Sequence, residues 1–184
     1  MIYSFNRIVK ESLPVLILSG IITIGAGLVL NSSEKMITAF PGIIIMMPAF
    51  INMVGGLMSV LASRLSSALH LGMIHPKLHK TKTLDRNIIA MIIISLISFT
   101  FLGIIGSILL TVLGLVNTNM VLFTFMVLVA GLLTTMILMA FTIVLSYYLF
   151  KKGDDPDNWV IPILTSVSDL IGVIIFISFV SLII

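Results

Sequence analysis

The sequence predicts an all-α integral membrane protein with five transmembrane helices, on three observations. Of the 184 residues, 59% are apolar and 9% are charged, whereas an ordinary soluble domain is about 45–50% apolar and about 25% charged. Ten Lys and Arg with seven Asp and Glu cannot cover the surface of a soluble globule of 20.0 kDa. The charge-free stretches between them are long enough to cross about 30 Å of hydrocarbon, and they lack the alternation of transmembrane β-strands.

Five spans are predicted within a single domain that covers residues 1–184: residues 12–31, 40–71, 87–115, 120–150 and 159–184. The first follows a basic segment with Arg7 and Lys10, as in a signal peptide, but no cleavage site comes after it, so we expect it to be retained. The second is roughly 45 Å long at 1.5 Å per residue, so it must tilt, kink or protrude. Pro48 and the pair Gly55-Gly56 are where a kink is expected.

The last three spans are separated by loop-forming segments. Residues 87–150 carry no charge over a length too great for one span. Gly114 and the triplet Asn117-Thr118-Asn119 divide this stretch in two, because Gly and Asn favour turns. A charged segment with Asp154 then precedes the fifth span, whose only ionisable residue is Asp169.

The basic residues predict the orientation in the membrane. Nine of the ten Lys and Arg fall on one side if Arg64 snorkels to that interface; the other eight are Arg7, Lys10, Lys77, Lys80, Lys82, Arg86, Lys151 and Lys152. Only Lys35 lies on the far side. By the positive-inside rule, we expect the N-terminus inside and the C-terminus outside a cell membrane. This placement explains the net charge of +3, so the expected surrounding partner is lipid and no nucleic acid is expected.

Asp169 is the residue that most strongly suggests a function. It lies about 15 Å from Trp159 and about 22 Å from Ile184 along a helix, close to the bilayer midplane. An Asp at that depth costs about 2.5–3.5 kcal/mol, and apart from Arg64 near a helix end there is no basic residue to pair with it. Water or a bound cation is the expected partner. The alternative is a protonated carboxyl group hydrogen-bonded to a neighbouring helix.

A polar stripe runs along the second span. Its members recur at spacings of 4, 3, 4, 3 and 4, which places them on one helical face: Asn52, Gly56, Ser59, Ser63, Ser66 and His70. The stripe is typical either of a wet pathway or of a small-residue seam between packed helices. Asn52 favours the pathway, since its carbonyl oxygen is a ligand for hard cations.

Three acids precede the fifth span and allow two interpretations that hold together. Asp154, Asp155 and Asp157 could attract cations to a cytoplasmic mouth of the pathway. They also fit a turn at Asp155-Pro156 with a helix N-cap at Asp157 or Asn158.

The sequence argues against an enzyme. With no Cys, there is no thiol nucleophile, disulfide or iron–sulfur site. No Ser has a His at membrane depth, no two carboxylates are paired within a span, and no phosphate-binding loop is present.

Two segments carry a resemblance to a known family. PAFINMVGGLMSVLASRLSSALHLG, residues 48–72, and DPDNWVIPILTSVSDLIG, residues 155–172, resemble the membrane domain of the MgtE family and its eukaryotic solute-carrier relatives. These proteins carry magnesium and other divalent cations. The likeness is strongest to the second repeat of members that contain two repeats in one chain. Leu57, Met58 and Val60 depart from the family pattern, in which polar or acidic residues are common at these positions.

The resemblance implies a mechanism and a ligand set. In the family, two five-helix units pair, and the cation passes along the interface that spans two and five line. Asp169 matches the ion-binding aspartate, with Thr165 and Gly172 one turn on either side, and Gly55-Gly56 matches the glycine pair of span two. The resemblance also implies that the chain pairs either as a homodimer or with a related, more polar half.

The combined hypothesis is a divalent cation transporter or channel. Two Asp169 carboxylates from two chains supply the charge of −2 that a buried divalent cation requires, and Mg²⁺ is the expected ion. The full predicted metal site is Asp169, Thr165, Gly172, Asn52 and Gly56, and the predicted pore lining is Gly55, Ser59, Ser63, Ser66 and Ser166. Two alternatives remain at this stage: a membrane subunit that forms a pore only with a different partner, and a proton-coupled solute carrier.

Overall fold

The protein is a bundle of helices. The computed structural model describes residues 5–75, 81–115 and 119–182, and the regular secondary structure in these ranges is α-helical. The helices are α1 (Phe5–Ser32), α2 (Glu34–Ala39), α3 (Gly42–His70), α4 (Lys82–Val112), α5 (Met120–Lys152) and α6 (Pro156–Val180). Within the described ranges, five of them are long and apolar enough to cross a membrane. The predicted all-helical fold with five apolar spans is therefore confirmed, and the protein is a multi-pass membrane protein.

The helix ends show why the helices begin where they do. The Thr81 hydroxyl accepts a hydrogen bond from the Leu84 amide at 3.2 Å, so α4 begins in the polar loop, before the apolar stretch. At the start of α6, the Asp155 carboxylate accepts from the Asp157 amide at 3.1 Å. The expectation of an N-cap at Asp157 or Asn158 is therefore wrong. Asp155 caps the helix because Pro156, which has no amide hydrogen, fits its first turn.

The short helix α2 was not expected from the sequence. It occupies the connection between α1 and α3, and its first turn carries Glu34. The following helix α3 continues through Pro48 and the pair Gly55-Gly56. Proline has no amide hydrogen, so Pro48 removes one backbone hydrogen bond from the helix. Helix α3 nevertheless remains a single helical segment.

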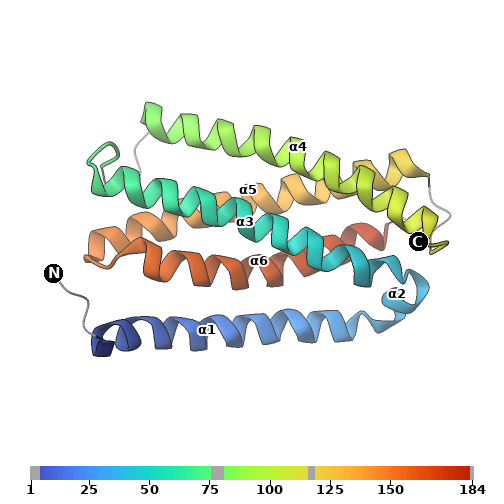
Figure 1. Cartoon of the computed structure of the whole chain (residues 1–184), viewed down its shortest axis with the longest axis horizontal. Helices are drawn as coiled ribbons and strands as arrows, with labels where there is room; N and C mark the ends of the chain where they lie inside the picture. Colours follow the sequence, from blue (N-terminus) through green and yellow to red (C-terminus); the bar gives the residue numbers. More distant parts are fainter. Residues whose placement is uncertain (1–4, 76–80, 116–118, 183–184) are drawn as a thin grey trace.

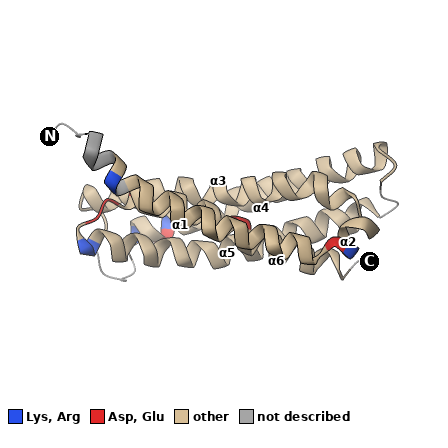
Figure 2. Cartoon of the chain, turned by 90° about the horizontal axis from the view of Figure 1, so that it is seen from below, with Lys and Arg blue, Asp and Glu red and all other residues tan. Residues whose placement is uncertain are grey.

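Figure 1 shows α4 at the top, α3 and α6 in the middle and α1 at the bottom, with α5 running behind α3. Helix α6 packs extensively on α1, α3 and α5, whereas the extensive contacts of α1 are with α6 alone. Accordingly, α1 is the least buried of the five spans over its apolar stretch. The charged residues that the structure describes lie toward the two ends of the bundle, apart from Asp169 in the middle of α6 (Figure 2).

The buried core joins α3 to α4 and α6 through three fully buried aromatic rings. The Phe50 ring centroid lies 5.4 Å from that of Phe99 and 4.8 Å from that of Phe176. Helix α5 can approach this cluster because residue 131 is a glycine. A Cβ atom placed there would lie 2.2 Å from Cγ of Phe99, which is closer than atoms pack.

We predict that Gly131→Ala destabilises the bundle. The added methyl group overlaps the buried Phe99 ring, and overpacking of this kind costs about 1–3 kcal/mol. The matched control is Gly20→Ala on α1, where an added Cβ has no atom within 4 Å. Thermal unfolding in detergent should show a lower midpoint for Gly131→Ala and an equal or higher midpoint for Gly20→Ala. Equal midpoints for the two variants would show that α5 does not pack in this way.

Candidate functional site

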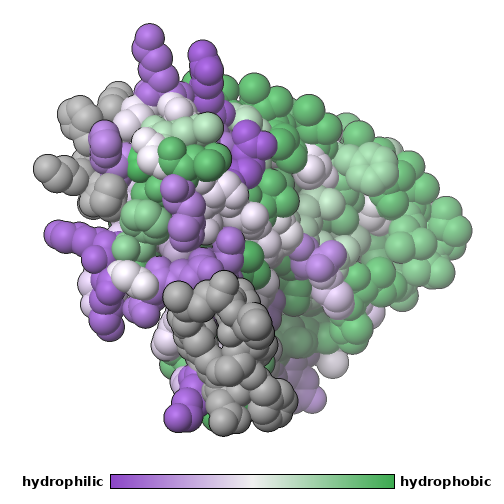
Figure 3. Space-filling view, turned by 60° about the vertical axis from the view of Figure 1, so that its left-hand side comes forward, coloured by the Kyte–Doolittle hydropathy of each residue, from purple (hydrophilic) through white to green (hydrophobic). Residues whose placement is uncertain are grey.

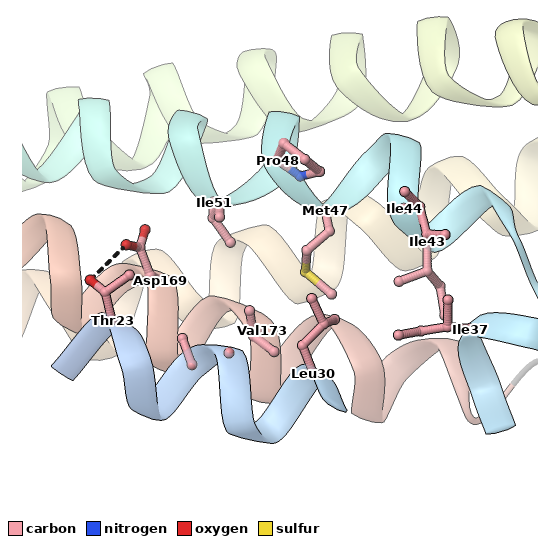
Figure 4. A pocket seen from close by; sticks show the side chains of 12 residues that line it. Thr23, Leu30, Ile37, Ile43, Ile44, Met47, Pro48, Ile51, Asp169 and Val173 are labelled. Atoms are coloured by element: carbon pink, nitrogen blue, oxygen red, sulfur yellow. Dashed lines mark hydrogen bonds between the residues drawn. The ribbon is translucent and has the colours of Figure 1, made fainter. Parts of the chain in front are cut away.

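Asp169 lies in a groove between α1 and α3, and α6 forms the floor of this groove. A cavity of about 360 Å³ extends along it, with walls from α1, α2, α3 and α6. Its lining residues are Thr23, Ala26, Gly27, Leu30, Ile37, Ile43, Ile44, Met47, Pro48, Ile51, Asp169 and Val173. Figure 4 shows Asp169 and Thr23 together at one end of the groove and apolar side chains along the rest.

The Asp169 carboxylate is half-buried and makes its hydrogen bond with a neighbouring helix. The Thr23 hydroxyl of α1 donates to Oδ2 of Asp169 at 3.3 Å. Asp169 is 13 residues after the start of α6 and 11 before its end, so at 1.5 Å per residue it lies near the middle of the bundle. A polar group at this depth is costly unless it has partners. One long hydrogen bond satisfies only part of the capacity of a carboxylate.

A second polar contact between α1 and α6 lies one to two turns before Asp169 on α6. The Ser19 hydroxyl donates to the Pro162 carbonyl oxygen at 3.0 Å and also contacts the Ser166 hydroxyl. Sequence reasoning missed both Ser19 and Thr23. Their spacing of four residues on an otherwise apolar helix places them on one face, and this was the signal available. These bonds tie α1 to the part of α6 that holds Asp169.

The hydroxyl groups near Asp169 use their protons within their own helix. Thr165 and Ser166 donate to the Pro162 carbonyl oxygen at 2.9 and 3.1 Å, and Ser168 donates to the Thr165 carbonyl oxygen at 2.7 Å. A hydroxyl oxygen that donates its proton keeps two lone pairs. Thr165 is half-buried, whereas Ser166 and Ser168 are buried. Thr165 is therefore the hydroxyl of the predicted set that is better placed to face a ligand.

The glycines of the predicted site serve two different purposes. Gly55 and Gly172 are buried where α3 meets α6: an added Cβ would lie 3.0 Å from Oγ of Ser168 at Gly55 and 3.1 Å from Cγ2 of Ile51 at Gly172. Both allow close approach of the two helices. Gly56 is exposed and has no atom within 4 Å of an added Cβ, so its backbone is accessible from outside the chain.

The polar stripe of α3 does not lie on one equally exposed face. Asn52, Gly56, Ser63 and His70 are exposed, Ser59 is half-buried and Ser66 is buried. The Ser59 hydroxyl donates to the Gly55 carbonyl oxygen at 2.8 Å. Asn52 lies beside the groove, because Pro48, in the groove wall, precedes it by one turn on the same side of the helix. Ser63 instead lines a separate pocket between α3 and α4.

The acids of the predicted cytoplasmic mouth lie far from Asp169. Asp154 and Asp155 are half-buried and Asp157 is exposed, at the end of the bundle where α6 begins. Asp157 is about 18 Å from Asp169 along the helix axis, from 1.5 Å per residue. Among the described residues, no three His, Asp or Glu side chains come together as a metal-binding group. The groove of one chain therefore offers a single carboxylate with hydroxyl and backbone oxygens.

Comparison with known protein families identifies the chain. The model of the MgtE family, described as a divalent cation transporter, matches residues 47–179. This match begins in the second turn of α3 and ends near the end of α6, so it includes Asp169 and leaves out α1 and α2. No curated protein matches the chain. Because the family match covers more than half of the sequence, the chain belongs to the MgtE family of divalent cation transporters, which are not enzymes.

Proposed function

We propose that two copies of this chain form a Mg²⁺ pathway, with the ion bound between their two Asp169 carboxylates. The observation that carries the proposal is a lone carboxylate in a groove at the middle of the bundle, with a hydroxyl group as its hydrogen-bond partner. A carboxylate that is desolvated without a cation is unfavourable. A bound divalent cation keeps the acid ionised and offsets its cost.

Charge balance supports two chains. One Asp169 leaves a buried Mg²⁺ with a net charge of +1, and an unpaired charge in a low-dielectric interior costs several kcal/mol. Two symmetry-related carboxylates neutralise the ion. Most homo-oligomers are twofold dimers in which both subunits use the same surface, so a site on the axis receives one Asp169 from each chain.

The exposed part of the α3 stripe supports the location of the interface. Asn52 exposes an amide group on a helix that is long and apolar enough to span the membrane. Lipid cannot hydrogen-bond that amide, whereas a second chain or a water-filled pathway can. Gly56 adds an exposed backbone at which another helix or an ion could approach closely. We therefore place the interface along α3 and α6, with the groove opening toward it.

The proposed ligands are oxygen atoms, as Mg²⁺ prefers. Mg²⁺ keeps several waters because it dehydrates reluctantly, so most contacts of Thr165, Asn52 and the backbone of Gly56 and Gly172 pass through water. The predicted pore-lining residues, Gly55, Ser59, Ser63, Ser66 and Ser166, stay part of the proposal as the surroundings of this path. Gly55, Ser66 and Ser166 are buried within one chain, so they act by shaping the helix packing.

The proposed direction of transport is into the cell. The distribution of Lys and Arg supports a cell membrane with the N-terminus inside and the C-terminus outside. Asp154, Asp155 and Asp157 then lie at the cytoplasmic mouth. A membrane potential of 100 mV drives two positive charges inward with about 4.6 kcal/mol.

We predict that Asp169→Asn abolishes Mg²⁺ flux. Asn keeps the shape of the side chain but removes the charge that holds the ion. Uptake into proteoliposomes, followed with a Mg²⁺-sensitive dye, should fall at least tenfold. The control is Glu34→Gln in α2, an acid outside the groove, which should transport like the wild type. Flux equal to the wild type in Asp169→Asn would remove Asp169 from the mechanism, and flux that follows pH and ignores Mg²⁺ would favour a proton-coupled carrier.

We also predict a specific cysteine crosslink between two chains. The sequence has no Cys, so each single-cysteine variant reports on one position. Asn52→Cys, on the proposed interface, should form a disulfide-linked dimer in oxidised membranes. Ile97→Cys is the matched control, because Ile97 is 62% exposed in the middle of α4.

The crosslinking result separates the possible assemblies. A dimer through position 52 but not through position 97 agrees with the proposed interface. A dimer only through position 97, or the absence of any dimer from either variant, would contradict the homodimer and favour pairing with a different chain.

A further inference from the structure

We propose that a pocket between α3 and α4, centred on Arg64, binds the phosphate group of an anionic phospholipid. The pocket has a volume of about 260 Å³. Ser63, Arg64, Ser67 and Leu71 line it from α3 and the residue after it, and Thr83 and Asn87 line it from α4. It lies on the opposite side of α3 from α1 and α6. Of the residues proposed for the Mg²⁺ pathway, Ser63 also lines this pocket, but Arg64 and Asn87, which carry the present proposal, do not belong to that pathway.

Arg64 is held in place by a buried amide. Its Nε donates to Oδ1 of Asn87 at 2.7 Å, and Nδ2 of Asn87 donates to the Thr83 carbonyl oxygen at 2.9 Å. Asn87 is only 5% exposed, so this chain of bonds fixes the direction of the guanidinium group. The bond to Asn87 uses one of its five N–H donors. The planar fork of the remaining donors matches two oxygens of a phosphate.

Hydroxyl groups beside Arg64 complete a site for an anion. Ser63 and Ser67 are exposed and lie one turn apart on α3, on the same side of the pocket. Each hydroxyl can donate to a phosphate oxygen. The described side chains that line the pocket include one cation and no acid. A phosphate there would gain a charge-assisted bond without facing a carboxylate in the lining.

The position of the pocket agrees with the headgroup layer of a membrane. Arg64 is six residues before the end of α3 and Asn87 is five residues after the start of α4, which is about 9 and 7.5 Å from the helix ends. These ends lie at the basic end of the bundle, where Figure 3 shows hydrophilic side chains gathered at one end of an apolar body. Basic pockets between helices at this level bind lipid headgroups.

Apolar side chains next to the pocket favour a lipid over free phosphate. Leu71 is 69% exposed and Met73 is 60% exposed at the rim. Val60, one turn from Arg64 toward the middle of α3, is 51% exposed. A phospholipid would place its phosphate on Arg64 and its glycerol and acyl chains along these residues. Free phosphate would gain nothing from them.

The test is native mass spectrometry of the purified full chain in detergent. The chain is titrated with phosphatidylglycerol, which is anionic, and with phosphatidylcholine, which is zwitterionic. We expect the first phosphatidylglycerol to bind at least tenfold more tightly than phosphatidylcholine. Arg64→Gln should reduce the affinity for phosphatidylglycerol about tenfold, since it removes a charge-assisted contact.

Two further variants make the result specific to the pocket. Arg86→Gln removes an exposed charge from the same end of α4, outside the pocket, and should change the affinity less than twofold. Arg64→Lys keeps the positive charge but lacks the planar guanidinium group. Its affinity for phosphatidylglycerol should lie between those of the wild type and Arg64→Gln. If Arg64→Gln does not fold, the proposal is tested by the lipid preference of the wild type and by the effect of Arg64→Lys on that preference.

Three outcomes would overturn the proposal. The first is equal affinity of the wild type for the two lipids. The second is an equal effect of Arg64→Gln and Arg86→Gln, which would indicate diffuse attraction to the basic end. The third is binding of inorganic phosphate as tightly as phosphatidylglycerol, together with displacement of the lipid by it, which would assign the site to a soluble anion.

Discussion

The structure depends on the packing of α6 between α1 and α3, because this packing decides what surrounds Asp169. A carboxylate at the middle of a membrane-spanning helix cannot face lipid without a large cost. Here its helix packs on three neighbours, and the side chain lines the groove between α1 and α3. The groove is apolar over most of its length, so Asp169 and Thr23 form a small polar site in an otherwise apolar surface.

Helices α3 and α6 can approach each other closely because small residues lie at their contact. Gly55 and Gly172 let the two backbones come together, since a side chain at either position would press on Ser168 or Ile51. Without a hydrophobic driving force between helices in lipid, such close packing and interhelical hydrogen bonds hold a bundle together. Both glycines also belong to the proposed ion site. Of the three glycines proposed for the ion path, Gly55 and Gly172 are buried in this contact, whereas Gly56 has an exposed backbone with free space around it.

The surroundings of Asp169 extend beyond the segment that matches the MgtE family. The match covers residues 47–179, whereas Ser19 and Thr23 belong to α1. Helix α1 makes its extensive contacts with α6 and is otherwise the most exposed span. Its two hydroxyl groups are thus well placed to orient the part of α6 that holds the acid.

The sequence by itself determined the five apolar helices, the membrane as solvent and Asp169 as the deep acid, because composition and helix length are local properties. It also led to the MgtE family through two segments on α3 and α6. Only the tertiary structure decided which side chains meet. It showed Thr23 at Asp169, buried Ser66 beside exposed Ser63, and Asp155 instead of Asp157 as the helix cap. The rotation of a helix about its axis and its choice of neighbours follow from packing across the whole bundle, and in uniformly apolar helices the sequence carries little periodic signal for either.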